Sequence, residues 1–170
     1  PARLGSLSPE PGQTNRRITV EIIQWSPTLE TGIDVIDQQH KRIVDYINAL
    51  RIAQGKGDRG AVAKTIDDVI DYTRSHFGFE EALMEAAGYT MINAHKLTHE
   101  MFIGRVALLN QRFKDGEDIA QDLYDMLSNW LITHIQTEDQ DYVGAVKEKM
   151  VGVVADQKRR KSLLARFFGA

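Results

Sequence analysis

From residue 36 onward, apolar residues recur every three or four positions, the spacing that places side chains on one face of an α-helix. The first such series is Ile36, His40, Ile43, Ile47 and Leu50. It predicts a helix from Ile36 to about Ala53. The run GKGDRG at 55–60 ends it, because clustered glycines and charges favour a loop.

Three further stretches have the same period. The second covers residues 62–84 and ends at Gly88, a typical helix stop. The third runs from about Met91 to Phe113 and precedes the loop KDGED at 114–118. The fourth starts near Asp118 and continues to about Met150. Four long amphipathic helices joined by short loops predict an all-α fold, an up-down-up-down antiparallel four-helix bundle with facing positions lining its core.

The two ends of the chain differ from this pattern. Three of the four prolines lie in the first eleven residues, where large apolar side chains are few, so we expect residues 1–17 to form a disordered N-terminal arm. The bundle then covers residues 18–150, with the β-branched run ITVEII as an irregular lead-in. Residues 151–170 form a basic C-terminal tail, which predicts contact with a protein partner or an anionic membrane surface; the alternative is a solvated helix extension.

Composition excludes several classes of protein. The 170 residues, 42% of them apolar, fit one globular domain. A net charge of -3 disfavours a nucleic-acid partner. The absence of cysteine leaves only nitrogen and oxygen ligands for any metal. No apolar run reaches the roughly 18 residues of a membrane span or resembles a signal peptide, so we expect a cytoplasmic protein of unassigned oligomeric state.

The candidate chemistry lies in the five histidines, all of which fall on the inward stripes of the predicted helices: His40, His76, His95, His99 and His134. A single buried histidine is usually a structural residue with a partner, but five spread over four helices indicate a shared site. His95 and His99 are four residues apart, so they lie on one helix face and can bind the same ion. His76 and Glu80 repeat this spacing.

The spacing of His134 and Asp139 is less regular. Five residues place them about 140° apart on an α-helix, so a shared site requires a π-bulge or a similar widening. With both carboxylates, the layer contains seven ligands, too many for one tetrahedral zinc ion. Seven ligands suit two near-octahedral ions that share bridging carboxylates and leave one position open. The donor types leave iron, manganese, zinc and copper as alternatives.

Four segments resemble the motifs of the hemerythrins, in particular the bacterial hemerythrin-like domains, over roughly residues 18–150. In order, they are GIDVIDQQHKRIVDYIN, HFGFEEALM, HKLTH and WLITHIQTED. The resemblance implies a non-haem di-iron centre with a solvent-derived bridge. It assigns His95, His99 and His134 to one iron, His40 and His76 to the other, and Glu80 and Asp139 to bridging positions. It also implies that dioxygen binds at the open position of the two-histidine iron.

Apolar residues next to the ligands predict a dry oxygen pocket: Ile43, Phe77, Trp130, Leu131 and Ile135. The alternative is ordinary core packing, and Leu131 is the one that resembles the pocket position of the family. We expect Glu81 to be solvated or to lie behind the ligands. Asp37, Gln38 and Gln39 receive no chemical role beyond an acidic residue near a helix start.

The predicted function is reversible dioxygen binding for storage or delivery, without enzymatic activity. Two ferrous ions with mostly neutral nitrogen donors leave a net positive site, which should resist further oxidation. Di-iron oxygenases have more carboxylates and Glu-x-x-His pairs, and no such layout occurs here. Three alternatives stay open: an oxygen or redox sensor that signals through its termini, a di-iron peroxidase or nitric-oxide-handling enzyme, and a bundle with structural metals.

Overall fold

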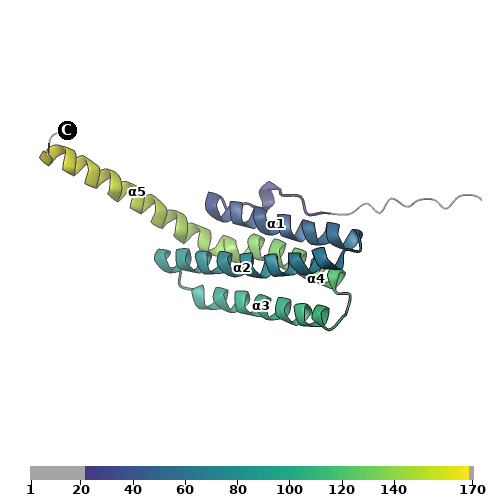
Figure 1. The fold of residues 1–170 in the computed structure, drawn as a ribbon. Coiled ribbons are helices and arrows are strands. Elements are labelled where there is room, and N and C mark those ends of the chain that lie inside the picture. The colour runs from purple at the N-terminus through teal and green to yellow at the C-terminus, as the bar shows by residue number, and fades with distance from the viewer. Residues whose placement is uncertain (1–21, 169–170) are drawn as a thin grey trace, which may run out of the picture.

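The computed structural model describes residues 22–168, with side chains up to residue 158, and within this range it contains helices and no strands. The bundle consists of α1 (Asp34–Gly55), α2 (Arg59–Ala87), α3 (Ile92–Lys114) and a fourth helix in three parts. These parts are α4 (Ala120–His134), the π turn η2 (Ile135–Asp139) and α5 (Gln140–Phe168). A short 3-10 turn, η1 (Pro27–Leu29), precedes α1. The all-α four-helix bundle is therefore confirmed (Figure 1).

Local signals explain where the helices begin and end. Asp58 caps α2 by accepting a hydrogen bond from the backbone N–H of Ala61 at 2.9 Å. Gly88 ends the same helix with φ 72°, in the left-handed region that favours glycine. Before α1, the Asp37 carboxylate accepts hydrogen bonds from the N–H groups of Thr31 and Gly32 and from the Thr31 hydroxyl. Asp37 thus fixes the start of α1, where an acidic residue was expected, through hydrogen bonds that the sequence did not predict.

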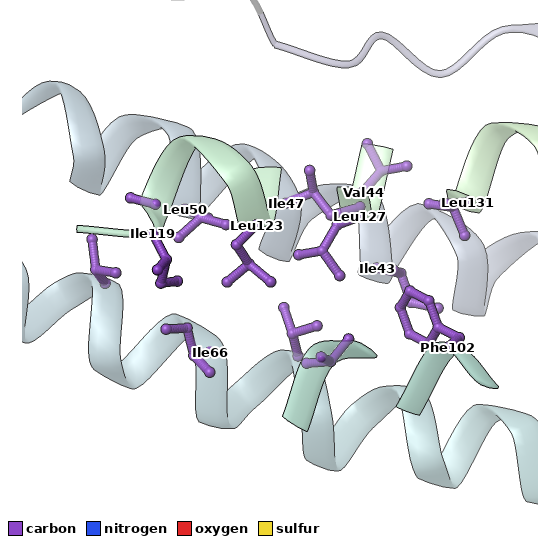
Figure 2. Packing of buried hydrophobic residues seen from close by; sticks show 14 of the residues in the cluster. Ile43, Val44, Ile47, Leu50, Ile66, Phe102, Ile119, Leu123, Leu127 and Leu131 are labelled. Carbon is purple, nitrogen blue, oxygen red and sulfur yellow. The ribbon is translucent and has the colours of Figure 1, made fainter. Parts of the chain in front are cut away.

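The apolar core has two parts, one on each side of the buried histidines. The larger part contains the residues labelled in Figure 2, from Ile119 at one end to Phe102 and Leu131 at the other. The smaller cluster consists of Ile33, Ile36, Met84, Tyr142 and Val146. On α1, His40 lies between Ile36 of the small cluster and Ile43 of the large one, and the other helices repeat this order. The core therefore holds a polar layer between two apolar ones.

Helix α5 is longer than the sequence pattern predicted. We expected the fourth helix to end near Met150, but α5 continues to Phe168 and projects beyond the bundle (Figure 1). Its residues from 150 to 158 are exposed, so no buried stripe marks this extension in the sequence. The predicted arm at 1–17 lies outside the described residues, as do the side chains of most of the basic tail. Within the described part of the chain, no helix is long and apolar enough to cross a membrane.

Candidate metal centre

Seven polar side chains meet in the layer between the two apolar clusters. They are the seven candidate ligands His40, His76, Glu80, His95, His99, His134 and Asp139, and none is more than 5% exposed. Each bundle helix contributes at least one of them. Burying so many polar groups is unfavourable without compensating partners, so their arrangement indicates a common ligand.

The histidines form two groups that share a carboxylate. Nitrogen and carboxylate atoms of His95, His99, His134 and Glu80 lie within 4.8 Å of one another, and so do those of His40, His76 and Glu80. This is the same division of the five histidines that the resemblance implies. Their role as metal ligands stays a prediction.

Each carboxylate lies between the two histidine groups. Glu80 Oε2 is 3.3 Å from His99 Nε2 and 3.8 Å from His76 Nε2. Asp139 Oδ1 is 3.0 Å from His134 Nε2, while its Oδ2 is 3.4 Å from His40 Nε2. Both carboxylates are therefore placed to bridge two cations, one in each histidine group.

The π turn brings Asp139 into this arrangement. In a regular α-helix, Asp139 would point away from His134, as the five-residue spacing indicated. The segment Ile135–Asp139 is a π-helical turn, so the helix widens at this position and both side chains face the layer. The predicted widening is present.

Several buried atoms in the layer have no hydrogen-bond partner within the described residues: both ring nitrogens of His40, Nε2 of His95, Oε2 of Glu80 and both carboxylate oxygens of Asp139. An unsatisfied buried polar atom costs about 1–3 kcal/mol. Imidazole nitrogens and carboxylate oxygens are atoms that metal ions take as ligands in proteins. The residues present therefore fit a pair of bound cations.

Three of the imidazoles are held from behind by hydrogen bonds to their Nδ1 atoms. The partner of His99 is Glu81 at 2.9 Å, and the partner of His134 is Glu138 at 2.6 Å. A carboxylate only accepts hydrogen bonds when ionised, so Nδ1 carries the proton and the Nε2 lone pair faces the layer. Glu81 thus lies behind the ligands, one of the two roles expected for it.

Three polar residues that hold the candidate ligands were missed in the sequence. Gln39 Oε1 lies 2.8 Å from His76 Nδ1, although we assigned Gln39 no chemistry. The Tyr142 hydroxyl donates a hydrogen bond to Glu80 Oε1 and leaves Oε2 directed at the histidines. Glu138 was also missed. Its position four residues after His134 could have indicated this contact, because side chains at that spacing lie on one helix face.

Burial keeps three of the imidazoles neutral. It lowers the pKa of His40 to about 3 and that of His76 to about 4, and it also lowers the pKa of His134. Neutral imidazole is the form that binds metal ions. Because three of the imidazoles are neutral near pH 7, they need no deprotonation before a cation binds.

The pKa values of the two carboxyl groups shift in opposite directions. Burial acts to raise the pKa of Glu80, but the adjacent imidazoles of His95 and His99 outweigh it and hold that pKa well below its usual range. Burial and the negative charge of Glu80 raise the pKa of Asp139 well above its usual range. A second negative charge in this layer is therefore unfavourable until positive charge enters, as bound cations would supply.

The predicted pocket residues lie next to the layer, but two of them contact the three-histidine group. The Phe77 ring stacks on His99 at 3.6 Å between centroids, and the Trp130 ring stacks on His134 at 4.2 Å. Ile43, Leu131 and Ile135 are buried in the large apolar cluster, and Figure 2 shows Ile43 and Leu131 at one end of it. That these residues form an oxygen pocket stays a prediction.

Comparison with known proteins agrees with this geometry. The sequence model described as Hemerythrin HHE cation binding domain matches residues 31–146. The chain belongs to the hemerythrin family. It is 48% identical to a bacteriohemerythrin of Stenotrophomonas maltophilia (strain R551-3) over 151 residues, which are 87% of this chain and 99% of the relative. The family's cation-binding description fits the buried His and carboxylate layer.

Other hemerythrins are similar over most of the chain. A bacteriohemerythrin of Methylococcus capsulatus is 36% identical over 113 residues, covering 66% of this chain and 86% of the relative. A crystal structure of wild-type hemerythrin superimposes with a TM-score of 0.70 at 32% identity, covering 74% of this chain and 98% of that chain. The shared bundle supports the placement of the buried layer within a hemerythrin fold.

Proposed function

We propose that this protein binds dioxygen reversibly at a non-haem di-iron centre, for oxygen storage or delivery. The observation that carries the proposal is the placement of Glu80 and Asp139 between two groups of buried histidines. In this proposal His95, His99 and His134 hold one iron, and His40 and His76 hold the other. Two ferrous ions held in such a site would supply two electrons to dioxygen and would recover them on its release.

The donor set favours binding over further oxidation. Five imidazoles add no charge when neutral, and the two carboxylates with one solvent-derived hydroxide leave the pair of ferrous ions net positive. Such a site disfavours high-valent iron, which needs more anionic donors. The group with His40 and His76 has one histidine fewer than the other, so an iron held there would have the exchangeable position.

The surrounding side chains exclude water and protons. Ile43, Phe77, Leu131 and Ile135 are buried and have no titratable group. The Tyr142 hydroxyl is already committed to Glu80, and burial raises its pKa, so it does not release its proton near pH 7. A wall without proton donors slows reactions that consume protons, such as the reduction of dioxygen to water.

Anaerobic loading of the full chain with ferrous iron tests the proposal. We expect two irons per chain and a visible absorption band that appears with dioxygen and disappears when it is removed. His76→Ala should lower the iron content, while Thr73→Val, a buried change outside the seven ligands, should not. Irreversible oxidation, or turnover of peroxide or nitric oxide well above that of free iron, would contradict a storage or delivery role.

One observation favours oxygen or redox sensing as a second candidate. Helix α5 starts directly after Asp139 and runs without a break to Phe168, beyond the bundle. A change at the layer therefore has a continuous helix along which to reach a protein partner or a membrane surface at the basic tail. Two results would support sensing. Hydrogen exchange in α5 would change when dioxygen is added, and truncation after residue 150 would abolish binding to a protein partner or to anionic liposomes.

A further inference from the structure

Helix α3 has a second apolar face that its own bundle does not use. Its members are spaced alternately by three and four residues: Ala94, Leu97, Met101, Gly104 and Leu108. We call this set the α3 stripe. Leu97, Met101 and Leu108 are 56%, 54% and 64% exposed. At about 100° per residue, the stripe lies roughly 155° from the buried face that includes His95 and His99.

The spacing of the stripe is that of a helix pair. Alternating steps of three and four residues form the a and d positions of a heptad, which face a neighbouring helix in coiled coils. A single exposed apolar residue needs no explanation, but an ordered series over two heptads does. In this series, Ala94, Met101 and Leu108 occupy a positions, and Leu97 and Gly104 occupy d positions.

Gly104 points to close approach by another helix. Glycine in the middle of a helix lowers its stability relative to alanine. A Cβ atom at Gly104 would meet nothing within 4 Å, so packing within the described residues does not require glycine here. A small residue at this position does allow a neighbouring helix to approach the backbone.

The flanking charges select the partner and its direction. Glu100 and Arg105 lie on opposite sides of the stripe, both are exposed, and neither has a hydrogen bond or ion pair within the described part of the chain. They occupy g and e positions of successive heptads. In a parallel helix pair, a g residue meets the e residue five positions later on the other helix. Two copies of α3 would therefore form two Glu100–Arg105 pairs.

We propose that the α3 stripe is the contact surface for a second copy of this chain, in a parallel dimer with its two-fold axis along α3. The apolar part covers residues 94–108, about 21 Å of helix. A contact along this length of one helix buries less surface than a standard protein interface, so we expect a weak dimer that forms at roughly 10 to 100 μM. The stripe faces away from the histidines, so its variants should keep the bundle and its bound iron.

Sedimentation equilibrium of the full chain between 10 and 500 μM tests the proposal. We expect a monomer–dimer equilibrium, and Leu97→Glu with Leu108→Glu should weaken it at least tenfold. The matched control is Val151→Glu with Val154→Glu, which adds the same charge to exposed apolar residues on α5. The control should dimerise like the wild type. Loss of the dimer in the control alone, or a wild type that stays monomeric at 500 μM, would overturn the proposal.

A charge exchange tests the parallel direction. Glu100→Arg alone brings like charges together and should weaken the dimer, whereas Glu100→Arg with Arg105→Glu should restore it. In an antiparallel pair, Glu100 would face Glu100 of the other copy and Arg105 would face Arg105, so the single variant would replace one like-charge pair with another and would not weaken the dimer. Failure of this rescue would overturn the parallel arrangement, provided that circular dichroism and iron content match the wild type.

Discussion

Replacing His40 with leucine should stabilise the metal-free protein while it removes one donor from the candidate metal centre. His40 is fully buried, and neither of its ring nitrogens has a hydrogen-bond partner among the described residues. Leucine has a similar volume and no polar atoms, so it leaves no unsatisfied group in that space. The substitution therefore separates the effect of His40 on the stability of the fold from its effect on metal binding.

The size of the effect follows from the two nitrogens. Each buried polar atom without a partner costs about 1–3 kcal/mol, and imperfect packing of leucine in place of a planar ring offsets up to about 1.5 kcal/mol of the gain. Taking about 1–2 kcal/mol for each of the two nitrogens and about 1 kcal/mol for the packing loss, we expect the free energy of unfolding to rise by about 1–3 kcal/mol in the presence of a chelator. At about 2–4 °C per kcal/mol for a domain of this size, the Tm rises by about 2–12 °C.

Urea unfolding followed by circular dichroism measures this change, with and without ferrous iron under anaerobic conditions. With iron the order should reverse, because only the wild type gains the full binding free energy. Thr73→Val is the matched control, since the Thr73 hydroxyl is also buried without a partner. It should be about 1 kcal/mol more stable in both conditions. A chelated His40→Leu protein that is less stable than the wild type would refute the reasoning.

Three other predictions concern the residues around the layer. Glu138→Gln weakens the hydrogen bond behind His134, so metal affinity measured by chelator competition should fall about 10- to 100-fold; unchanged affinity would contradict an orienting role. Tyr142→Phe leaves Glu80 Oε1 without its donor, and urea unfolding should show a loss of about 1–3 kcal/mol, which an equally stable variant would disprove. Between pH 6.5 and 5, His40 gains a proton in the unfolded state but not in the folded state, where burial holds its pKa at about 3. The metal-free wild type should therefore lose about 2 kcal/mol more than His40→Leu over this interval, and parallel pH profiles of the two would count against it.

The bundle and the seven candidate ligands were predictable because both depend on which helix face a residue occupies. The three- and four-residue spacing fixes that face for His95 and His99 without any knowledge of neighbouring helices. The five-residue step from His134 to Asp139 breaks the same rule, and this conflict predicted the π turn. The helical period thus identified the polar residues that face the core.

The hydrogen bonds behind the ligands were not predictable in this way. Gln39 reaches His76 on another helix, so the contact depends on how far α1 is shifted along α2, and periodicity carries no information on axial shift. Tyr142 received no role in the sequence analysis, although its hydroxyl donates a hydrogen bond to Glu80. The fourth helix was expected to end near Met150 because an exposed helix beyond the core has no buried stripe to mark it, although a helix extension was the alternative given for the tail.

The π turn has a consequence for insertions and deletions in this helix. In the buried series Leu131, His134, Asp139, Tyr142 and Val146, each residue follows the last by three or four positions, except for the five-residue step from His134 to Asp139. A chain shortened by Gln136 would have steps of three and four throughout, and a regular hydrogen-bond ladder would keep Tyr142 and Val146 on the core side. Only the widened turn that directs Asp139 toward both His134 and His40 would be lost. The extra residue therefore serves the site and is dispensable for the bundle.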